Sequence, residues 1–348
     1  MRISKGTNMA ENQKRATLKD VAKLAGVSVM AVANVMNNKG GISDSTAQRI
    51  REAAEKLNYI PNTVARSLRT SSSKIIGVIT SSLFSYLHWE VLSGIDKVAA
   101  ENDYSVIIHN TRNDTQKEHA AIELMKGRNI DGLIFIAPVD TSIEAITRLK
   151  NLPIPSVLIL RSGEVDGEDY ISSVYIDNID GGYSSMKHLL SAGEKNVYML
   201  INSKNKPSNQ RVEGAKKALI EYRIDMPKDH IIDIAAFSSD TSARVVKKLI
   251  DDGVSDAAFW CVSDVIALGA INGILSKDKS IPDDFRVIGY DDINLIDYMK
   301  VPFTTMDQPK AAMGSDAAQL LIDQIGGKIK TPEHHIYKSV LKKRISTR

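Results

Sequence analysis

The sequence predicts a small all-α unit followed by a larger α/β core built from two doubly wound parallel-sheet lobes. Residues 17–57 contain three short segments with the apolar spacing of amphipathic helices. From Lys74 onward, short β-branched or apolar runs alternate with helix-length amphipathic stretches. Such alternation is typical of parallel sheets covered on both faces. The stretch after Lys74 is about twice the size of one doubly wound unit, which predicts two lobes.

Residues 17–37, TLKDVAKLAGVSVMAVANVMN, predict two helices joined by a tight turn. Thr17 can cap the first helix, with Asp20 as the acidic partner of a capping box. Gly26 supplies the left-handed residue that ends this helix, and Ser28 can cap the second. This arrangement is the helix-turn-helix signature, which usually enters a DNA groove. The side chains expected to face the core of this unit are Val21, Leu24, Ala25, Val32, Val35 and Met36.

A third helix and a linker follow. Ser43–Leu57 is amphipathic, with apolar residues on one side and charged residues on the other. Pro61 can begin a further helix, but Asn62–Arg69 is too short to be stable alone in water. The polar residues Thr70–Ser73 complete a segment, 61–73, that we expect to fold only on a partner.

The core is predicted strand by strand from its short apolar runs. The expected strands are Ile75–Thr80, Ser105–Asn110, Gly132–Ala137, Ser156–Leu160, Val174–Ile176, Asn196–Ile201, Ala257–Val262 and Arg286–Tyr290. The expected helices between them include Val91–Asn102, Gln116–Arg128 and Asp180–Ala192. Ligands of open α/β sheets bind beyond the carboxyl ends of the strands, so the loops at those ends are the candidate site.

Charge is distributed unevenly along the chain. Residues 1–73 carry twelve Lys or Arg against five Asp or Glu, a net charge of +7, whereas the remainder is mildly acidic. A basic first fifth is expected of a unit that binds a polyanion, although a solvated basic face is the alternative. The single cysteine, Cys261, excludes an intramolecular disulfide and suits a reducing cytoplasm. No apolar stretch is long enough to span a membrane, and the N-terminus lacks the apolar core of a signal peptide.

Seven motifs occur in order along the chain: LKDVAKLAGVSVMAVANVMN, NYIPNTVARSLRT, IIGVI, VYIDNIDGGY (174–183), the R-x-x-G of 211–214, VIGYDD (287–292) and TTMDQP (304–309). Because it carries these motifs in this order, the chain resembles the lactose-repressor (LacI/GalR) family of bacterial transcription regulators. The resemblance covers nearly the whole chain except about the first fifteen residues. The helix-turn-helix alone is a moderate signal, but its combination with the later motifs is specific.

The resemblance implies a periplasmic-binding-protein-like core that holds a ligand between its two lobes. The implied units are a disordered extension (1–16), a helix-turn-helix headpiece (17–60), a hinge helix and linker (61–73), and an effector-binding and dimerisation core (74–348). In that fold the chain passes between the lobes three times. The expected passages, near residues 161, 292 and 325, are Leu160–Gly163, Asp291–Asn294 and Leu321–Lys330.

The second helix carries the residues expected to read DNA bases. Val29 and Met30 can press on a thymine methyl group, and Asn34 can bond adenine in a bidentate manner. The family usually has Thr where Ala31 stands, so we expect an operator different from the common one. The resemblance implies that Leu68 wedges into the minor groove, with packing on its own headpiece as the alternative. The expected DNA contacts are Thr17, Leu18, Ser28, Val29, Met30, Ala31, Asn34, Asn37, Ser43, Tyr59, Asn62, Ala65, Arg66 and Leu68.

Effector contacts are expected mainly from the resemblance. Arg211 matches the family's ligand-clamping arginine, whose planar fork suits hydroxyl pairs or a carboxylate. Asp264 and Asp291 end strands, where carboxylates can accept hydrogen bonds from sugar hydroxyls. Arg161 together with Arg211 points to an acidic or phosphorylated ligand, with a salt bridge at a passage between the lobes as the structural alternative. We expect a sugar or sugar acid ahead of a purine, bound by Tyr86, His88, Arg161, Asp177, Arg211, Phe237, Asp264 and Asp291.

Other classes of protein are disfavoured. The phosphate loops G-x-G-x-x-G and G-x-x-x-x-G-K-[ST] and the elbow G-x-S-x-G are absent, and His334 and His335 are adjacent rather than at metal-ligand spacing. We therefore expect no enzyme, cofactor or metal. A periplasmic solute-binding protein would share the core but not the basic headpiece. The expected protein is a cytoplasmic, homodimeric transcription repressor, whose affinity for a near-palindromic double-stranded DNA operator is controlled allosterically by a small metabolite.

Overall fold

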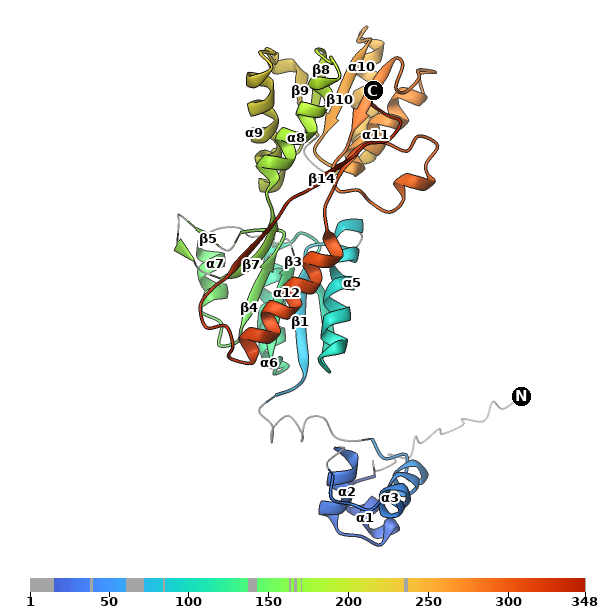
Figure 1. The fold of residues 1–348 in the computed structure, drawn as a ribbon, viewed down its shortest axis with the longest axis vertical. Coiled ribbons are helices and arrows are strands. Elements are labelled where there is room, and N and C mark those ends of the chain that lie inside the picture. The colour runs from blue at the N-terminus through green and yellow to red at the C-terminus, as the bar shows by residue number, and fades with distance from the viewer. Residues whose placement is uncertain are drawn as a thin grey trace, which may run out of the picture. The chain divides into compact units, whose positions relative to one another are not determined.

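The structure, a computed structural model, divides into two units between Ser73 and Lys74, and each is described by itself (Figure 1). The described residues are 16–37, 40–60, 72–83, 85–136, 143–162, 164–165, 168–169, 171–234 and 237–347. Within these ranges, no helix has the length and apolar character needed to cross a membrane.

The first unit is a headpiece of three helices, α1 (Leu18–Ala25), α2 (Val29–Met36) and α3 (Asp44–Lys56). The predicted capping box is present, because the Thr17 backbone N–H donates to Asp20 Oδ2 at 2.8 Å and the Asp20 backbone N–H donates to the Thr17 hydroxyl oxygen at 3.4 Å. Gly26 ends α1 at φ 64°, in the left-handed region that glycine tolerates. The buried core of this unit consists of Val21, Ala22, Ala25, Val32, Val35, Ala47, Ile50, Ala53 and Ala54.

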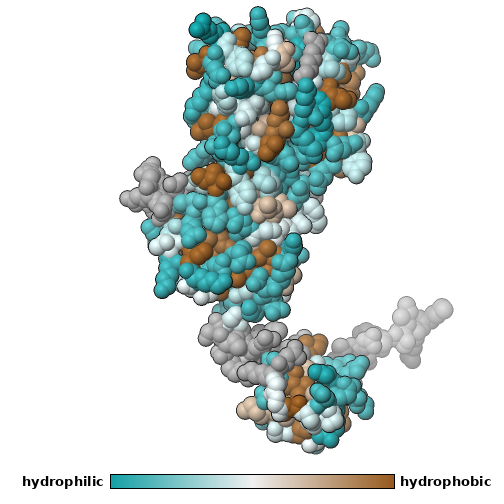
Figure 2. Space-filling model, in the orientation of Figure 1, coloured by the Kyte–Doolittle hydropathy of each residue, from teal (hydrophilic) through white to brown (hydrophobic). Residues whose placement is uncertain are grey.

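Leu24 does not face this core, contrary to the prediction. Its side chain is 52 % exposed, whereas Val21, Ala22 and Ala25 of the same helix are buried. An eight-residue helix buries one narrow stripe, and these three residues fill it, so Leu24 lies beside the stripe. Figure 2 shows apolar side chains at the headpiece surface.

The first lobe of the core is built on a six-stranded parallel sheet with the strand order β13-β7-β4-β3-β1-β2. Its strands are β1 (Ile75–Thr80), β2 (Ser105–Asn110), β3 (Gly132–Ile136), β4 (Ser156–Ile159), β7 (Ser172–Ile176) and β13 (His334–Tyr337). In the sequence, the two-residue strands β5 (Glu164–Val165) and β6 (Glu168–Asp169) come between β4 and β7 and are not part of this sheet. The helices of this lobe are α5 (Tyr86–Glu101), α6 (Thr115–Gly127), α7 (Ile143–Lys150) and α12 (Lys310–Ile325). Separate apolar clusters cover the sheet, one with α5 and α12 and the other with α6.

The second lobe has a four-stranded parallel sheet with the order β11-β10-β8-β9. Its strands are β8 (Val197–Ile201), β9 (Ile231–Asp233), β10 (Ala257–Cys261) and β11 (Phe285–Ile288). Its α-helices are α8 (Asn178–Ser191), α9 (Lys206–Glu221), α10 (Ser239–Asp251) and α11 (Asp264–Leu275). Two short 3-10 helices, η1 (Lys228–His230) and η2 (Ile296–Tyr298), complete this lobe. A separate antiparallel pair consists of β12 (Thr305–Asp307) and β14 (Val340–Lys342). The predicted fold, a helical headpiece followed by two parallel α/β lobes, is confirmed.

All three predicted passages between the lobes are wrong. The strands that flank Arg161, β4 and β7, both belong to the six-stranded sheet, so the first passage follows β7 at Asp177. The stretch after Ile325 leads from α12 to β13, which pairs with β7 in the same lobe. The third passage therefore comes at 338–339, before β14. The passage predicted at Asp291–Asn294 is also wrong, because Ile293, Ile296 and Phe303 lie in the apolar core of the second lobe. The chain therefore leaves this lobe only along β12, before α12 begins at Lys310.

Helices α5 and α12 cross at very close distance in the first lobe (Figure 1). A methyl group on Gly94 would collide with the carbonyl oxygen of Ala311, and one on Gly314 would collide with that of Val91. The Ser315 hydroxyl also donates to the Gly94 carbonyl at 3.2 Å. Because packed interiors resist deformation, the two helices form one closely packed pair.

Replacing Gly94 by alanine tests this close approach. We expect Gly94→Ala to lower the free energy of unfolding by about 1–3 kcal/mol, because the added methyl group overpacks the crossing. The measurement is urea denaturation followed by circular dichroism. Gly127→Ala is the matched control, since no atom lies within 4 Å of the position of its added Cβ. Equal losses in the two variants would contradict the crossing.

Candidate functional site

The outward face of α2 carries side chains predicted to meet DNA bases. Val29 is 41 % exposed and Met30 is 69 % exposed, which are large fractions for apolar side chains. Ala31 and Asn34 are half-buried on the same helix. Ser28 Oγ accepts a hydrogen bond from the Ala31 backbone N–H at 3.1 Å, so it caps α2 as predicted. This face combines apolar contact surface with a side-chain amide.

The remaining headpiece residues of the predicted DNA contacts have structural partners within the unit. The Ser43 hydroxyl and the Asn37 amide form hydrogen bonds inside the headpiece. Leu18 and Tyr59 pack against its apolar core, and burial raises the pKa of the Tyr59 phenol. The predicted contacts that fall outside the described residues are Asn62, Ala65, Arg66 and Leu68.

Arg211 on α9 lies at the centre of a cluster of polar side chains in the core. Its Nε donates to Asn178 Oδ1 at 2.9 Å, and its Nη1 donates to the Val262 carbonyl at 2.6 Å. The guanidinium carbon stands 3.6 Å from the centroid of the Tyr290 ring, a cation–π contact. Nη1 also lies 3.4 Å from Asp291 Oδ1. Among the described residues, Nη2 has no hydrogen-bond partner, so the arginine is fixed in place with one donor group unused.

Asp291 is held beside this arginine in a strained backbone conformation. Its φ of 125° is one that residues other than glycine rarely adopt. Its backbone N–H donates to the Met306 carbonyl at 2.9 Å, and its Oδ1 accepts from Gln308 Nε2 at 2.6 Å. Burial raises the pKa of Asp291, whereas the positive charges of Arg211 and Lys310 lower it. Such strain costs about 1–3 kcal/mol and is concentrated at ligand sites, where surrounding contacts maintain it.

Asp264 does not take the predicted role of a ligand acceptor. Its side chain is fully buried, and both of its oxygens are used within the chain. Oδ2 accepts from the Ile293 N–H at 2.9 Å, and Oδ1 accepts from the Thr305 hydroxyl at 2.6 Å. Burial and the nearby carboxylate of Asp291 raise the pKa of Asp264 to about 7. This residue therefore positions the segment after β11 instead of facing an effector.

The predicted residues of the first lobe include one buried and one exposed side chain at the start of α5. His88 is buried, and its Nδ1 lies 3.0 Å from both the Ser82 carbonyl and the Thr80 hydroxyl. Because a carbonyl only accepts, Nδ1 carries the proton; burial lowers the pKa of the ring, which leaves Nε2 as an acceptor. Tyr86 is exposed, and Arg161 lies half-buried after β4.

Two further predicted residues lie in loops of the second lobe and at its boundary. Phe237 is exposed and precedes Ser238, the N-cap of α10. Asp177 is the N-cap of α8, where its Oδ1 accepts from the Asp180 N–H at 2.9 Å. The Asp177 carboxylate therefore has a structural role at the first passage between the lobes.

Sequence reasoning missed three side chains that hold the Arg211–Asp291 pair: Asn178 bonds Arg211, and Gln308 and Lys310 bond Asp291. Asn178 and Gln308 lie within the motifs VYIDNIDGGY and TTMDQP, and each follows a strand. Amide side chains at strand ends are the signal that could have identified them. Lys310 begins an amphipathic helix, a position at which a charged residue is ordinarily solvated, so its sequence context carried no such signal.

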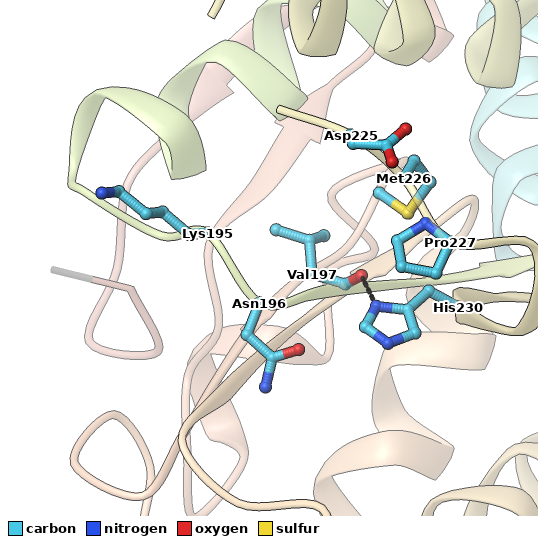
Figure 3. Close-up of a pocket in the computed structure, with 7 residues that line it drawn as sticks. All are labelled: Lys195, Asn196, Val197, Asp225, Met226, Pro227 and His230. Atoms are coloured by element: carbon cyan, nitrogen blue, oxygen red, sulfur yellow. Dashed lines mark hydrogen bonds between the residues drawn. The ribbon is translucent and has the colours of Figure 1, made fainter. Parts of the chain in front are cut away.

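A separate cavity of about 250 Å³ lies at the other end of the second lobe (Figure 3). His230 forms one wall, donates from Nδ1 to the Val197 carbonyl at 3.1 Å and stacks on Tyr198 with ring centroids 3.9 Å apart. The cavity adjoins the amino end of β8, whereas ligands of parallel sheets bind beyond the carboxyl ends. We therefore do not assign the effector to it. Its lining consists of Lys195, Asn196, Val197, Asp225, Met226, Pro227 and His230.

Comparisons with known proteins give matches over almost the whole chain. Residues 17–62 match the family described as bacterial regulatory proteins, lacI family, and residues 186–347 match the periplasmic binding protein-like domain. The chain is 32 % identical over 318 residues to the HTH-type transcriptional repressor PurR of Aliivibrio fischeri, covering 90 % of this chain and 93 % of that protein.

Solved structures agree with this result. The lac repressor dimer bound to operator and the anti-inducer ONPF has a TM-score of 0.83 at 26 % identity, covering 96 % of this chain and 99 % of that one. A LacI family transcriptional regulator from Enterococcus faecium with bound ribose has a TM-score of 0.69 at 28 % identity, covering 78 % of this chain and 98 % of that one.

The raised pKa of Asp264 predicts a pH-dependent stability. Between about pH 4 and pH 7 the unfolded chain loses this proton while the folded chain keeps it, so the free energy of unfolding falls as the pH rises. Relative to Asp264→Asn, the wild type should lose roughly 1 kcal/mol per pH unit across this window. Urea denaturation of both proteins from pH 5 to pH 7 measures the difference. Parallel stability curves would show that Asp264 ionises normally.

Proposed function

Because the chain belongs to the lacI family of bacterial regulatory proteins, and is a DNA-binding transcriptional repressor with a periplasmic-binding-protein-like domain, we propose that a small metabolite between its two lobes controls its affinity for operator DNA. The family consists of transcription regulators rather than enzymes. The metabolite is of the sugar or sugar-acid class. The DNA-binding form is a homodimer, because two equal headpieces match the two half-sites of a near-palindromic operator.

The arrangement of Arg211 and Asp291 is the observation that carries the proposal. The guanidinium is oriented by Asn178 and Tyr290 and keeps Nη2 unused among the described residues, while a carboxylate lies beside it. N–H donors next to carboxylate acceptors suit the neighbouring hydroxyl groups of a polyol or the carboxylate of a sugar acid. The regulator with bound ribose supports the sugar class. The name PurR of the curated relatives keeps a purine as the alternative.

The headpiece supports operator binding through its charge and its exposed side chains. Residues 1–73 carry a net charge of +7, which favours the phosphate backbone. Val29 and Met30 present apolar surface of the kind that contacts thymine methyl groups. Leu68 is proposed to wedge into the minor groove at the operator centre.

Asn34→Ala tests how the headpiece reads bases. We expect a loss of about 1–3 kcal/mol on the preferred operator and a relaxed preference at one base position per half-site. In vitro selection of binding sites and fluorescence anisotropy at fixed salt measure both effects. Gln48→Ala removes an exposed amide from α3 and serves as the control. An unchanged selection profile for Asn34→Ala would remove this residue from base recognition.

A thermal-shift screen of sugars, sugar acids, sugar phosphates and nucleobases tests the effector class. A ligand that binds only the folded state raises the melting temperature, and Arg211→Ala should abolish that rise. Arg244→Ala, at an exposed arginine on α10, should keep it. A full shift in Arg211→Ala would place the effector elsewhere, and a shift with nucleobases alone would replace the sugar class by the purine class.

The same ligand should alter operator affinity. Linkage requires effector and operator to change each other's affinity by one factor, typically about 5- to 150-fold. Titration of the ligand with and without operator measures this factor. A ligand that binds equally well in both titrations would not be a regulator.

A further inference from the structure

Lys310 is a buried cation at a position where helix electrostatics disfavour it. It is the first residue of α12 and only 4 % exposed. The amino end of a helix carries partial positive charge, so a lysine there gains nothing from the helix. Burying an ammonium group also costs free energy unless charges and hydrogen bonds compensate it. The location of Lys310 is therefore explained by its partners and not by the stability of α12.

Those partners come from both lobes. Lys310 Nζ donates to the backbone carbonyls of Asp291 and Asp292 at 2.7 and 3.0 Å, in the segment that follows β11 of the second lobe. It also lies 3.7 Å from Glu90 Oε2, on α5 of the first lobe, and 3.6 Å from Asp307 Oδ1. One ammonium group thus contacts the residue beside Arg211 and a helix of the opposite lobe.

Four residues form a continuous polar connection, which we term the Lys310 relay: Arg211, Asp291, Lys310 and Glu90. The successive distances are 3.4 Å between the guanidinium and the carboxylate, 2.7 Å between the Asp291 carbonyl and the ammonium, and 3.7 Å between the ammonium and Glu90. Contiguous networks of this kind can carry coupling between sites when the elements they join are rigid.

The first-lobe end of the relay depends on Lys310. Oε1 of Glu90 is buried and accepts no hydrogen bond from the residues that the structure describes. Burial raises the pKa of Glu90, and the charge of Lys310 lowers it. The ammonium group is therefore the cation that keeps this carboxylate in place on α5.

The glycine-mediated crossing of α5 and α12 makes the connection stiff. Lys310 begins α12, and Glu90 lies one helical turn before Gly94, where the two helix backbones touch. The crossing holds the two helix backbones against each other, so a displacement of the Asp291 segment that shifts the Lys310 ammonium acts on the first turn of α5 through the Glu90 carboxylate.

We propose that Lys310 is a positioning residue that transmits occupancy of the Arg211–Asp291 cluster to α5 of the first lobe through Glu90. The inference rests on the proposed function, since it assigns the route by which an effector between the lobes reaches the lobe that follows the headpiece linker. The alternative is an ion cluster that only stabilises the fold.

A double-mutant experiment tests the relay without an effector. The full-length chain is used with an operator fragment obtained by in vitro selection, and Arg211→Ala is made in the wild-type and Glu90→Gln backgrounds. Glu90→Gln keeps the side-chain size and leaves the Lys310 contacts to the second lobe intact. Glu123→Gln is the matched control, because its glutamate pairs with Lys126 at 3.1 Å within α6 of the same lobe. Fluorescence anisotropy gives the operator Kd.

The expected result is a background-dependent effect of Arg211→Ala. It should change the operator Kd by at least about fivefold in the wild-type and Glu123→Gln backgrounds. In the Glu90→Gln background it should change Kd by less than about twofold, because the connection is cut. If Glu90→Gln does not fold, Lys310→Gln cuts the relay at its centre and should give the same loss.

Tryptophan fluorescence distinguishes the relay from an ion cluster that only stabilises the fold, because such a cluster would not change the signal. The chain has two tryptophans: Trp89, 68 % exposed beside Glu90, and the buried Trp260. In a Trp260→Phe background, acrylamide quenching of Trp89 reports on the first turn of α5. Arg211→Ala should change this quenching only when Glu90 is intact.

Two outcomes would overturn the relay. One is an equal effect of Arg211→Ala on operator Kd in the wild-type and Glu90→Gln backgrounds. The other is no effect of Arg211→Ala in any background, because there would then be no signal to transmit. The proposed function itself fails only if, in addition, no screened metabolite changes operator affinity.

Discussion

Burial of three carboxylates in one short region constrains how the two lobes are joined. Asp264, Asp291 and Asp292 are all buried, and a buried charge is tolerated only with compensating cations and donors. Asp292 is paired with Arg344 at 2.7 Å and Lys342 at 2.9 Å, in the segment that returns from β13. Arg211 of α9 and Lys310 of α12 compensate Asp291, whereas Asp264 accepts a hydrogen bond from Thr305 of β12 and has its pKa raised to about 7. Charge compensation therefore brings together chain segments that are distant in sequence and aligns the passages between the lobes.

The fold could be predicted from the sequence wherever the determining interactions are local or the pattern is long. The capping box of Thr17 and the left-handed Gly26 depend on residues within a few positions, and the apolar strands of the parallel sheets form continuous runs. None of the three passages between the lobes could be predicted correctly. Which sheet a short strand joins is decided by pairing with distant segments, and β13 pairs with β7, far earlier in the chain.

Motifs in the sequence identified residues of the candidate site, but the sequence could not predict which of these residues are buried. The R-x-x-G motif located Arg211, and VIGYDD located Asp291 beside it. Asp264 also follows a buried strand, yet its oxygens accept hydrogen bonds from Ile293 and Thr305. Only the tertiary path of the segment after β11 brings these two donors to Asp264. Lys310 could not be identified because its burial requires the close approach of α5 and α12. A sequence shows which residues can ionise, whereas tertiary packing decides which of them face solvent.

Both lobes are discontinuous in sequence, and this has a consequence for the order of folding during synthesis. The sheet of the first lobe needs β13, and the second lobe needs Ser346, whose carbonyl accepts from the Val287 N–H at 3.0 Å and whose Oγ accepts from the Thr304 N–H at 2.8 Å. The headpiece core, by contrast, closes within residues 17–60. Because domains fold as units while the chain emerges from the ribosome, the nascent headpiece acquires its structure before the α/β core is complete. Every newly made molecule thus passes through a period in which a folded headpiece is tethered to an incomplete core.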